Sequence, residues 1–308
     1  MHTPESPNMG VIPSELSDRH ASVPCMAIQA QHETHAQMLE PLAPHHLSLD
    51  SPATAWHAEI REVVENAIRT ADRSMQSEIG ASEIGTPCTR KLVFKLGNVP
   101  VVNQERAEWY IALGTAAHEW LATVFAMENM RLGFTRYLIE HQVVAGEIDG
   151  IELGGHLDIY DRVRHSITDW KNPGDRGMRR ARQGPDATYK TQVMVYGLGC
   201  ENAGLPVREV NIVSFPRLGT LRSINYWHAP YDRNVAVEAI SRASILRKRA
   251  KQIGYAELAA IAETQSDYCE YCPWFDPATR THELVYGRCP GSQEMITERE
   301  LVHVPPKF

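Results

Sequence analysis

Two acidic residues and a lysine near the middle of the chain have the types and spacing of a metal site. Residues 154–161 form an apolar-rich run that contains Asp158, and residues 167–171 form a short alternating run that contains Asp169 and Lys171. We interpret the two runs as the strands of a hairpin. Side chains two apart on a strand share a face, so Asp169 lies beside Lys171, and antiparallel pairing brings Asp158 to the same place.

Paired carboxylates beside a lysine have a specific chemical use. Neighbouring carboxylates repel each other, and a hard divalent cation such as Mg²⁺ or Mn²⁺, which prefers carboxylate oxygen and water as ligands, relieves the repulsion. The cation lowers the pKa of a water and stabilises charge on a phosphate, while the lysine orients the water or neutralises developing charge. An isolated D-x-K triplet also arises by chance as a surface salt bridge, so the assignment depends on the rest of the chain.

The composition is that of an ordinary soluble protein. The 308 residues suffice for one large domain or two modest ones, and 43% of them are hydrophobic and 22% charged. No apolar run approaches the roughly 20 residues of a membrane span, so we expect no membrane association. The N-terminus lacks a basic stretch followed by an apolar core, so we expect no signal peptide and a cytoplasmic location.

The net charge of −7 argues against a basic protein that simply coats nucleic acid. It leaves open an enzyme of nucleic acids, whose acidic site is neutralised by a metal and whose contacts are local. Two basic runs supply such contacts or are solvated helix faces. The first, our candidate for DNA binding, consists of Arg176, Arg179, Arg180 and Arg182. The second, more typical of a solvated face, consists of Arg242, Arg247, Lys248, Arg249 and Lys251.

The elements that must position these residues follow from the periodicity of apolar positions. Helices are predicted at 56–75, from residue 87, and at 105–127, 187–203 and 232–252. Strands are predicted at 137–144, 151–163, 167–171, 208–215 and 223–228. This order indicates an α/β core with a mixed sheet. Residues 1–53 are expected to form a disordered or loosely packed arm, ahead of a domain at 54–308 whose segment 255–308 carries a group of cysteines.

Two of the predicted helices carry polar residues of interest. His118 lies on an apolar face of the helix at 105–127, where a histidine taken alone is more often a core residue than a ligand. Gln192 and Tyr196 are four residues apart and therefore share one face of the helix at 187–203.

The chain has six cysteines, and a C-x-x-C pair in a cytosolic protein favours metal binding or redox chemistry over disulfides. The candidate ligands are Cys88, Cys269, Cys272 and Cys289. Four thiolates suit a [4Fe–4S] cluster or zinc, and His282 in place of Cys88 would give a Cys₃His zinc site. Chance burial is the remaining interpretation, and it is the one we expect for Cys25 and Cys200.

In their order along the chain, these residues resemble the RecB-like branch of the PD-(D/E)xK nucleases. The matching positions are His118, Gly155-x-x-Asp158, Asp169-x-Lys171 and Gln192-x-x-x-Tyr196. One cysteine before this core and three after it are similar to the iron–sulfur members, which include the CRISPR-associated RecB-like exonucleases, their phage homologues and the AddB nuclease domain. The resemblance spans about residues 82–290.

The resemblance implies a restriction-endonuclease-like α/β core, with a mixed sheet flanked by helices and a C-terminal segment clasped by the metal cluster. It implies metal-dependent hydrolysis of DNA, often from the ends of single strands. The implied ligands of Mg²⁺ or Mn²⁺ are His118, Asp158, Asp169 and the backbone carbonyl of Trp170. Lys171 would position the attacking water, and Gln192 and Tyr196 would hold the lysine or the DNA backbone.

The sequence departs from the family at three places. No proline precedes Asp158, and Asp169 stands where many relatives have glutamate, although either residue can ligate a cation. The loop from Cys272 to Cys289 is longer than usual, which leaves both iron–sulfur and zinc open. Two other functions also stay open: a non-catalytic nucleic-acid-binding or adaptor subunit of a recombination or CRISPR-type complex, and a zinc-stabilised protein with an incidental D-x-K. A homo-oligomer or a recombination or CRISPR partner is compatible with the resemblance.

Overall fold

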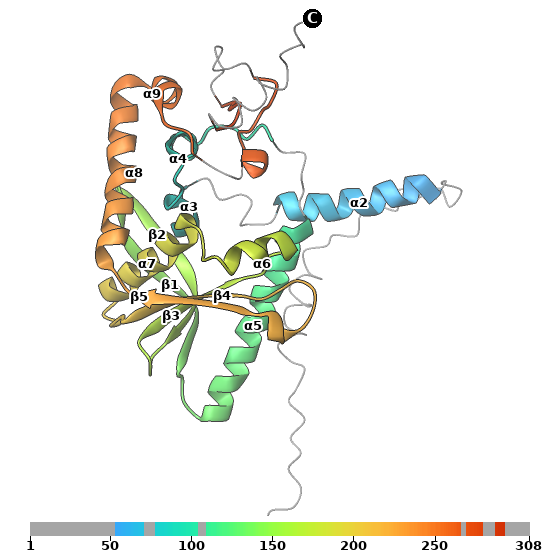
Figure 1. The fold of residues 1–308 in the computed structure, drawn as a ribbon, viewed down its shortest axis with the longest axis vertical. Coiled ribbons are helices and arrows are strands. Elements are labelled where there is room, and N and C mark those ends of the chain that lie inside the picture. Colours follow the sequence, from blue (N-terminus) through green and yellow to red (C-terminus); the bar gives the residue numbers. More distant parts are fainter. Residues whose placement is uncertain (1–52, 71–77, 104–108, 266–268, 280–286, 293–308) are drawn as a thin grey trace, which may run out of the picture. The chain divides into compact units, whose positions relative to one another are not determined.

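The computed structural model describes residues 53–70, 78–103, 109–265, 269–279 and 287–292. Chain contacts separate residues 1–58 from residues 59–308, and the elements from α3 onward belong to the second unit. The helices of the described residues (Figure 1) are α2 (Ala53–Thr70), which spans the division, then α3 (Ala81–Ile84), α4 (Thr89–Leu96), α5 (Trp109–Leu132), α6 (Asp175–Ala181), α7 (Ala187–Asn202), α8 (Arg233–Ile253), α9 (Tyr255–Ile261) and the 3₁₀ turns η2 (Leu221–Ser223) and η3 (Cys269–Tyr271). The strands are β1 (Tyr137–Ile148), β2 (Ile151–Asp161), β3 (Ser166–Lys171), β4 (Glu209–Ser214) and β5 (Asn225–Pro230).

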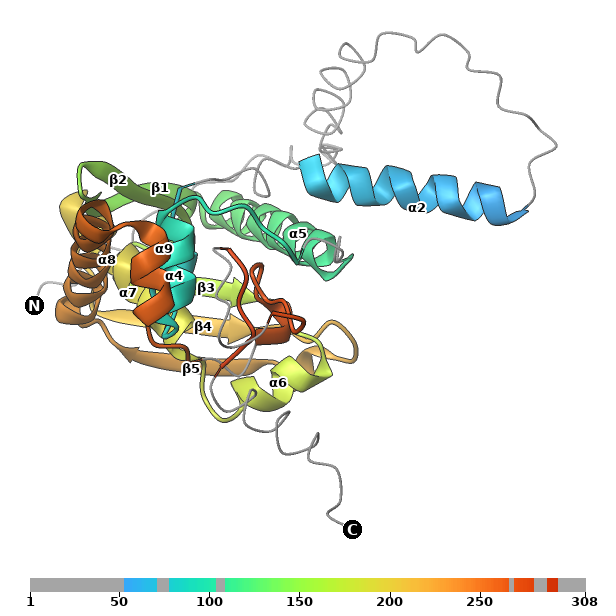
Figure 2. The same cartoon turned by 90° about the horizontal axis from the view of Figure 1, so that it is seen from above.

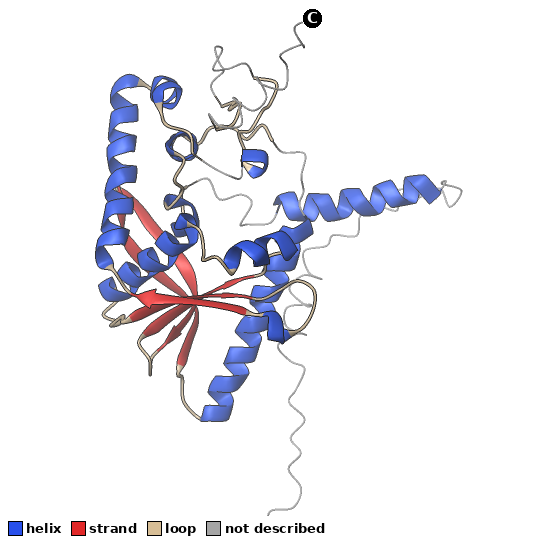
Figure 3. Ribbon diagram, viewed as in Figure 1, coloured by secondary structure: helices blue, strands red, loops and turns tan. Residues whose placement is uncertain are grey.

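The five strands form one sheet in the order β1-β2-β3-β4-β5 (Figure 3). β3 and β4 run parallel, and the other neighbouring pairs are antiparallel. The crossover between the parallel strands contains α6 and α7. The mixed α/β sheet flanked by helices is therefore confirmed, as are the hairpin of β2 and β3 and the place of each predicted strand.

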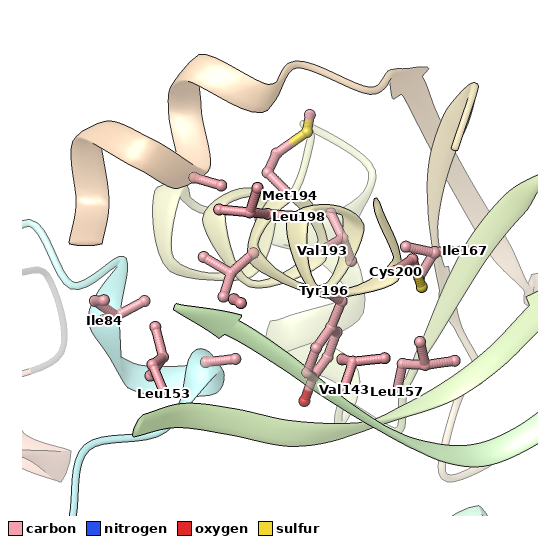
Figure 4. Packing of buried hydrophobic residues seen from close by; sticks show 14 of the residues in the cluster. Ile84, Val143, Leu153, Leu157, Ile167, Val193, Met194, Tyr196, Leu198 and Cys200 are labelled. Carbon is pink, nitrogen blue, oxygen red and sulfur yellow. The ribbon is translucent and has the colours of Figure 1, made fainter. Parts of the chain in front are cut away.

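Helices cover both faces of the sheet, and a separate apolar cluster lies under each. On one face, α7 packs on the first three strands, where Leu157 and Val193 are fully buried (Figure 4). On the other face, Leu121 of α5 packs against Trp170 of β3. Figure 2 shows α5 on the side of the strands away from α7 and α8. The two clusters fix which strand residues face α5 and which face α7.

The alternation of β1 and β2 changes phase in the middle of each strand. On β1, Ile139 packs in the α5 cluster and Val143 in the α7 cluster, although residues four apart on a regular strand share a face. On β2, Leu157 and Ile159 likewise pack on opposite sides. Glu140 has φ of 46°, in the left-handed region, and this backbone turn accounts for the change on β1. A non-glycine residue there costs of order 1 kcal/mol.

Helix α7 begins where its sequence predicts and is buried along most of its length. The side chain of Asp186 caps it by accepting a hydrogen bond of 3.0 Å from the backbone N–H of Tyr189. Gly199 lets the helix approach β1, because a Cβ at this position would lie 2.8 Å from the side chain of Val143. Close packing on the strands places the residues of α7 that precede Gly199 over β3.

Several boundaries differ from the predictions. The helix expected at 105–127 continues to Leu132 and ends at Gly133, whose φ of 75° suits glycine. Cys88 does not lie in the first turn of its helix but caps it, with its sulfur accepting from the N–H of Lys91. Helices α3, α6 and α9 were not predicted, since each is too short for periodicity to identify.

Some expectations fall on residues that the structure does not describe. The predicted arm at 1–53 and the end of the first helix, at 71–77, lie outside the described residues, apart from Ala53 at the start of α2. His282, the alternative zinc ligand, and Cys25 lie outside them too. Within the described part of the chain, no helix is both long and apolar enough to cross a membrane.

Candidate metal centre and cysteine cavity

The two aspartates of the D…D-x-K set lie where β2 and β3 part. The ladder between these strands ends at the pair Ile159 and Thr168, so Asp158 and Asp169 occupy the next, unpaired rung. In place of a ladder bond, the backbone N–H of Trp170 donates to Oδ2 of Asp158 at 2.6 Å. Both aspartates are buried.

Lys171 is held on the face that the alternation predicts. Its Nζ lies 2.6 Å from Oδ2 of Asp169 and donates to Oε1 of Gln192 at 3.0 Å. Gln192 in turn donates from Nε2 to Oδ1 of Asp169 at 3.0 Å, and its Nε2 also lies 3.4 Å from the hydroxyl of Tyr196. The ring of Tyr189 lies 4.5 Å from the lysine nitrogen. Gln192 of α7 therefore fixes the lysine and the second aspartate together, and Tyr196 lies beside Gln192.

The charges of this group are strongly coupled. Burial raises the pKa of Asp169 to about 6, with the attraction of Lys171 opposing and the repulsion of Asp158 adding to the effect. Burial lowers the pKa of Lys171, but its ion pair with Asp169 outweighs burial, so the net shift is upward. The ion pair therefore favours the charged form of Lys171.

His118 reaches the same place from helix α5. Its Nδ1 lies 3.1 Å from Oδ1 of Asp158, and its side chain is 19% exposed. Burial lowers the pKa of His118, but the hydrogen bond and the charge of Asp158 outweigh it, so the net shift is upward. The apolar setting of this histidine in sequence is thus misleading, because Leu121 one turn later supplies the packing.

The structure adds Glu140, which sequence reasoning missed. Ligand atoms of His118, Glu140 and Asp158 all lie within 4.8 Å of one another. Glu140 is an exposed residue of β1 at the position facing Asp158, between the register pairs on either side. The sequence signal that could have identified Glu140 is a carboxylate on β1, the strand that pairs with β2. Regular alternation of side chains does not show on which face Glu140 lies, because β1 changes phase at this residue.

The basic runs have different surroundings. Arg176 pairs with Glu270 at 3.2 Å, whereas Arg179 and Arg182 are exposed on and just after α6. In the second run, Arg242 donates to the backbone carbonyl of Thr86 at 2.7 Å. Part of the second run is therefore structural and not merely a solvated face.

Four cysteines line a second site. A cavity partly open to solvent is bordered by Cys88, Arg90, Lys91, Phe94, Thr264, Cys269, Cys272, Phe275, Cys289 and Gly291. These residues come from α4 and from the C-terminal segment, which lies beside α4 and α9 in Figures 1 and 2. Cys200, by contrast, is buried in the α7 cluster as expected.

The cavity has a positive lining and buried sulfurs. Nη1 of Arg90 donates to the sulfur of Cys289 at 3.7 Å, and the N–H of Lys91 donates to the sulfur of Cys88 at 3.5 Å. Burial raises the pKa of the Cys272 thiol to about 11. A bound metal would favour the thiolate form of Cys272, because the thiolate is the form that ligates a metal.

No family model and no curated protein matches the chain. Among solved structures, SSO0001 has a TM-score of 0.44 at 14% identity over 69% of this chain and 92% of that chain. An alkaline exonuclease from Laribacter hongkongensis has a TM-score of 0.40 at 12% identity, over 57% of this chain and 89% of that chain. A phage-related exonuclease from Haemophilus somnus 129PT has a TM-score of 0.31 at 14% identity, over 46% of this chain and 72% of that chain.

Proposed function

We propose that this protein is a divalent-cation-dependent deoxyribonuclease that acts as an exonuclease on single strands or free DNA ends. The observation that carries the proposal is the convergence of Asp158, Asp169 and Lys171 with His118 at the point where two strands part. Four separate parts of the chain contribute to it: α5, β2, β3 and, through Gln192, α7.

The donor set fits a hard divalent cation. Carboxylate oxygens with one imidazole nitrogen suit Mg²⁺ or Mn²⁺, and the mutual repulsion of the two aspartates is the condition such a cation relieves. Asp158, Asp169 and His118 would hold it, with the carbonyl of Trp170 as a predicted further ligand. When bound, the cation supplies Lewis acidity at a phosphate oxygen and activates water.

The remaining residues orient and neutralise. Lys171 carries a permanent positive charge beside the carboxylates, so it orients the attacking water and stabilises negative charge on the phosphate in the transition state. Gln192 holds the side chains of Lys171 and Asp169 in place, because it forms a hydrogen bond with each of them. Arg179 on α6 and Arg182 just after it are exposed. These two arginines are our candidates for binding the phosphate backbone.

The four-cysteine cavity is proposed to hold a structural [4Fe–4S] cluster. The four cysteines border one cavity and would supply one thiolate to each of the four irons. Arg90 and Lys91 offset the negative charge of the cluster.

The nuclease proposal is tested with end-labelled single-stranded DNA and protein purified without oxygen. We expect loss of label with Mn²⁺ or Mg²⁺ and none with EDTA. Lys171→Ala should lower the rate by about a hundredfold or more, while Lys190→Ala, an exposed lysine on the same helix as Gln192, should retain it. Wild-type protein that carries its cluster but never cleaves would favour the non-catalytic DNA-binding or adaptor function instead.

The cluster proposal is tested by visible absorption and metal analysis of the same protein. We expect broad visible absorption and about four iron atoms per chain. Cys289→Ser should lose both, while Cys200→Ala, which removes a cysteine outside the cavity, should keep them. A colourless protein with stoichiometric zinc would contradict the cluster and support the zinc-stabilised alternative.

A further inference from the structure

We propose that Glu140 is a further ligand of the divalent cation, so that the cation is held from β1 as well as from α5 and β2. This inference rests on the proposed function and extends it by one residue. The motif order that led to the metal site contains no residue from β1, and nothing in the sequence motif assigns Glu140 a role.

The distances carry the first part of the argument. Oxygen ligands lie about 2.0–2.6 Å from Mg²⁺ or Ca²⁺-sized cations, so two ligand atoms of one cation are at most about 4–5 Å apart. The ligand atoms of His118, Glu140 and Asp158 meet this limit, since all lie within 4.8 Å of one another. The three residues come from three elements that meet at the same place.

The pairing of Asp169 carries the second part. Oδ2 of this carboxylate lies 2.6 Å from Nζ of Lys171, and Oδ1 accepts a hydrogen bond from Gln192. Asp169 therefore shares its negative charge between Lys171 and the cation that it is proposed to ligate. A further carboxylate on the β1 side of Asp158 adds negative charge to the ligand set, and Glu140 is in that position.

The strand pairing carries the third part. Glu140 faces Asp158 between the register pairs Ile139–Ile159 and His141–Leu157. Like charges directly opposite on antiparallel strands destabilise a sheet. A divalent cation between the strands turns this repulsion into attraction.

The same two strands contain a second facing pair of carboxylates that serves as a control. Glu147 and Glu152 are register partners farther along β1 and β2, and both are exposed to water. Water screens their repulsion without a cation. Glu147→Gln therefore removes the same charge from the same strand without touching the proposed ligand set.

The test is the affinity for Mn²⁺, measured by electron paramagnetic resonance of free Mn²⁺ on cluster-loaded protein without DNA. Glu140→Gln should weaken binding by about tenfold or more, and Glu140→Asp, which keeps the charge on a shorter side chain, should recover part of the loss. Glu147→Gln should bind like wild type. The rise in melting temperature on adding Mn²⁺ should follow the same order.

The outcomes separate this inference from the function on which it rests. Equal Mn²⁺ affinity in Glu140→Gln and Glu147→Gln, with binding lost in Asp158→Asn, would overturn the role of Glu140 and leave the metal site standing. Wild-type protein that binds no Mn²⁺ would overturn both proposals.

Discussion

The hairpin of β2 and β3 has a buried aspartate at each end, and the two aspartates differ in the partners of their carboxylates. At the closed end, Asp161 accepts three hydrogen bonds from the guanidinium of Arg136 and two from the backbone N–H groups of Val163 and Arg164. At the open end, Asp169 shares its site with a lysine and a second carboxylate.

Their pKa values move in opposite directions. Burial alone would raise the pKa of Asp161, but the bonds from Arg136 and the turn outweigh it, so the net shift is downward. The pKa of Asp169 instead rises to about 6. Burial therefore does not by itself make a carboxylate functional. A carboxylate with all its partners built in stabilises a turn, and one with a competing carboxylate is suited to bind a cation.

The largest expected effect separates the two aspartates by catalysis. Asp169→Asn should lower DNA cleavage by about a hundredfold or more, because several kcal/mol of charge stabilisation depend on the cation site. Asp161→Asn should stay within about threefold of wild type once folded, since its partners are Arg136 and the turn. Rates on end-labelled DNA measure both, and equal losses in the two variants would remove the distinction.

The second effect separates them by stability. Asp161→Asn should lower the free energy of unfolding by about 2 kcal/mol, because it weakens charge-assisted bonds to Arg136 and leaves that arginine without its counter-ion. Asp169→Asn, measured in EDTA, should lower it by less, because the variant removes the counter-ion of Lys171 but also relieves the repulsion from Asp158. Urea denaturation with the cluster intact gives both values, and a loss in Asp169→Asn as large as that in Asp161→Asn would contradict the comparison.

The third effect is the dependence of these differences on pH. A lowered pKa in the folded protein adds stability above the usual value of 3.8 that is lost as pH falls through the folded value. A raised pKa adds stability below 3.8 that is lost as pH rises through about 6. In EDTA, wild type should therefore lose stability relative to Asp169→Asn between about pH 4 and pH 7, while its advantage over Asp161→Asn persists across that range. Parallel curves for the two variants would contradict the assignment.

The smallest effect concerns Tyr196, at the edge of the open end. Tyr196→Phe keeps the ring that lies against Gly155, where a Cβ would be only 3.1 Å from the ring, and removes a hydroxyl 3.4 Å from Gln192. Loss of one long neutral hydrogen bond should slow cleavage by about fivefold or less. A loss as large as that of Lys171→Ala would place Tyr196 in direct contact with the reacting groups.

Sequence periodicity was sufficient for the sheet and the long helices, because their apolar positions follow one period over many residues. Asp169, Lys171 and Gln192 were predictable for the same reason, since each lies on a regular element. The position of Glu140 was not predictable, because Glu140 itself has a left-handed backbone conformation, and the periodicity of apolar residues does not indicate such a conformation. Helix α6 was also missed, since seven residues with four charged side chains show no apolar face.

The cysteine cavity is built from residues on both sides of the sheet in the sequence. Cys88 precedes the whole sheet, and the other three cysteines follow it. During synthesis, which proceeds from the N-terminus, the four cysteines come together only after all five strands and α8 have been made. With the proposed cluster in this cavity, the iron content of a preparation would measure the fraction of chains in which synthesis and folding of the core are complete.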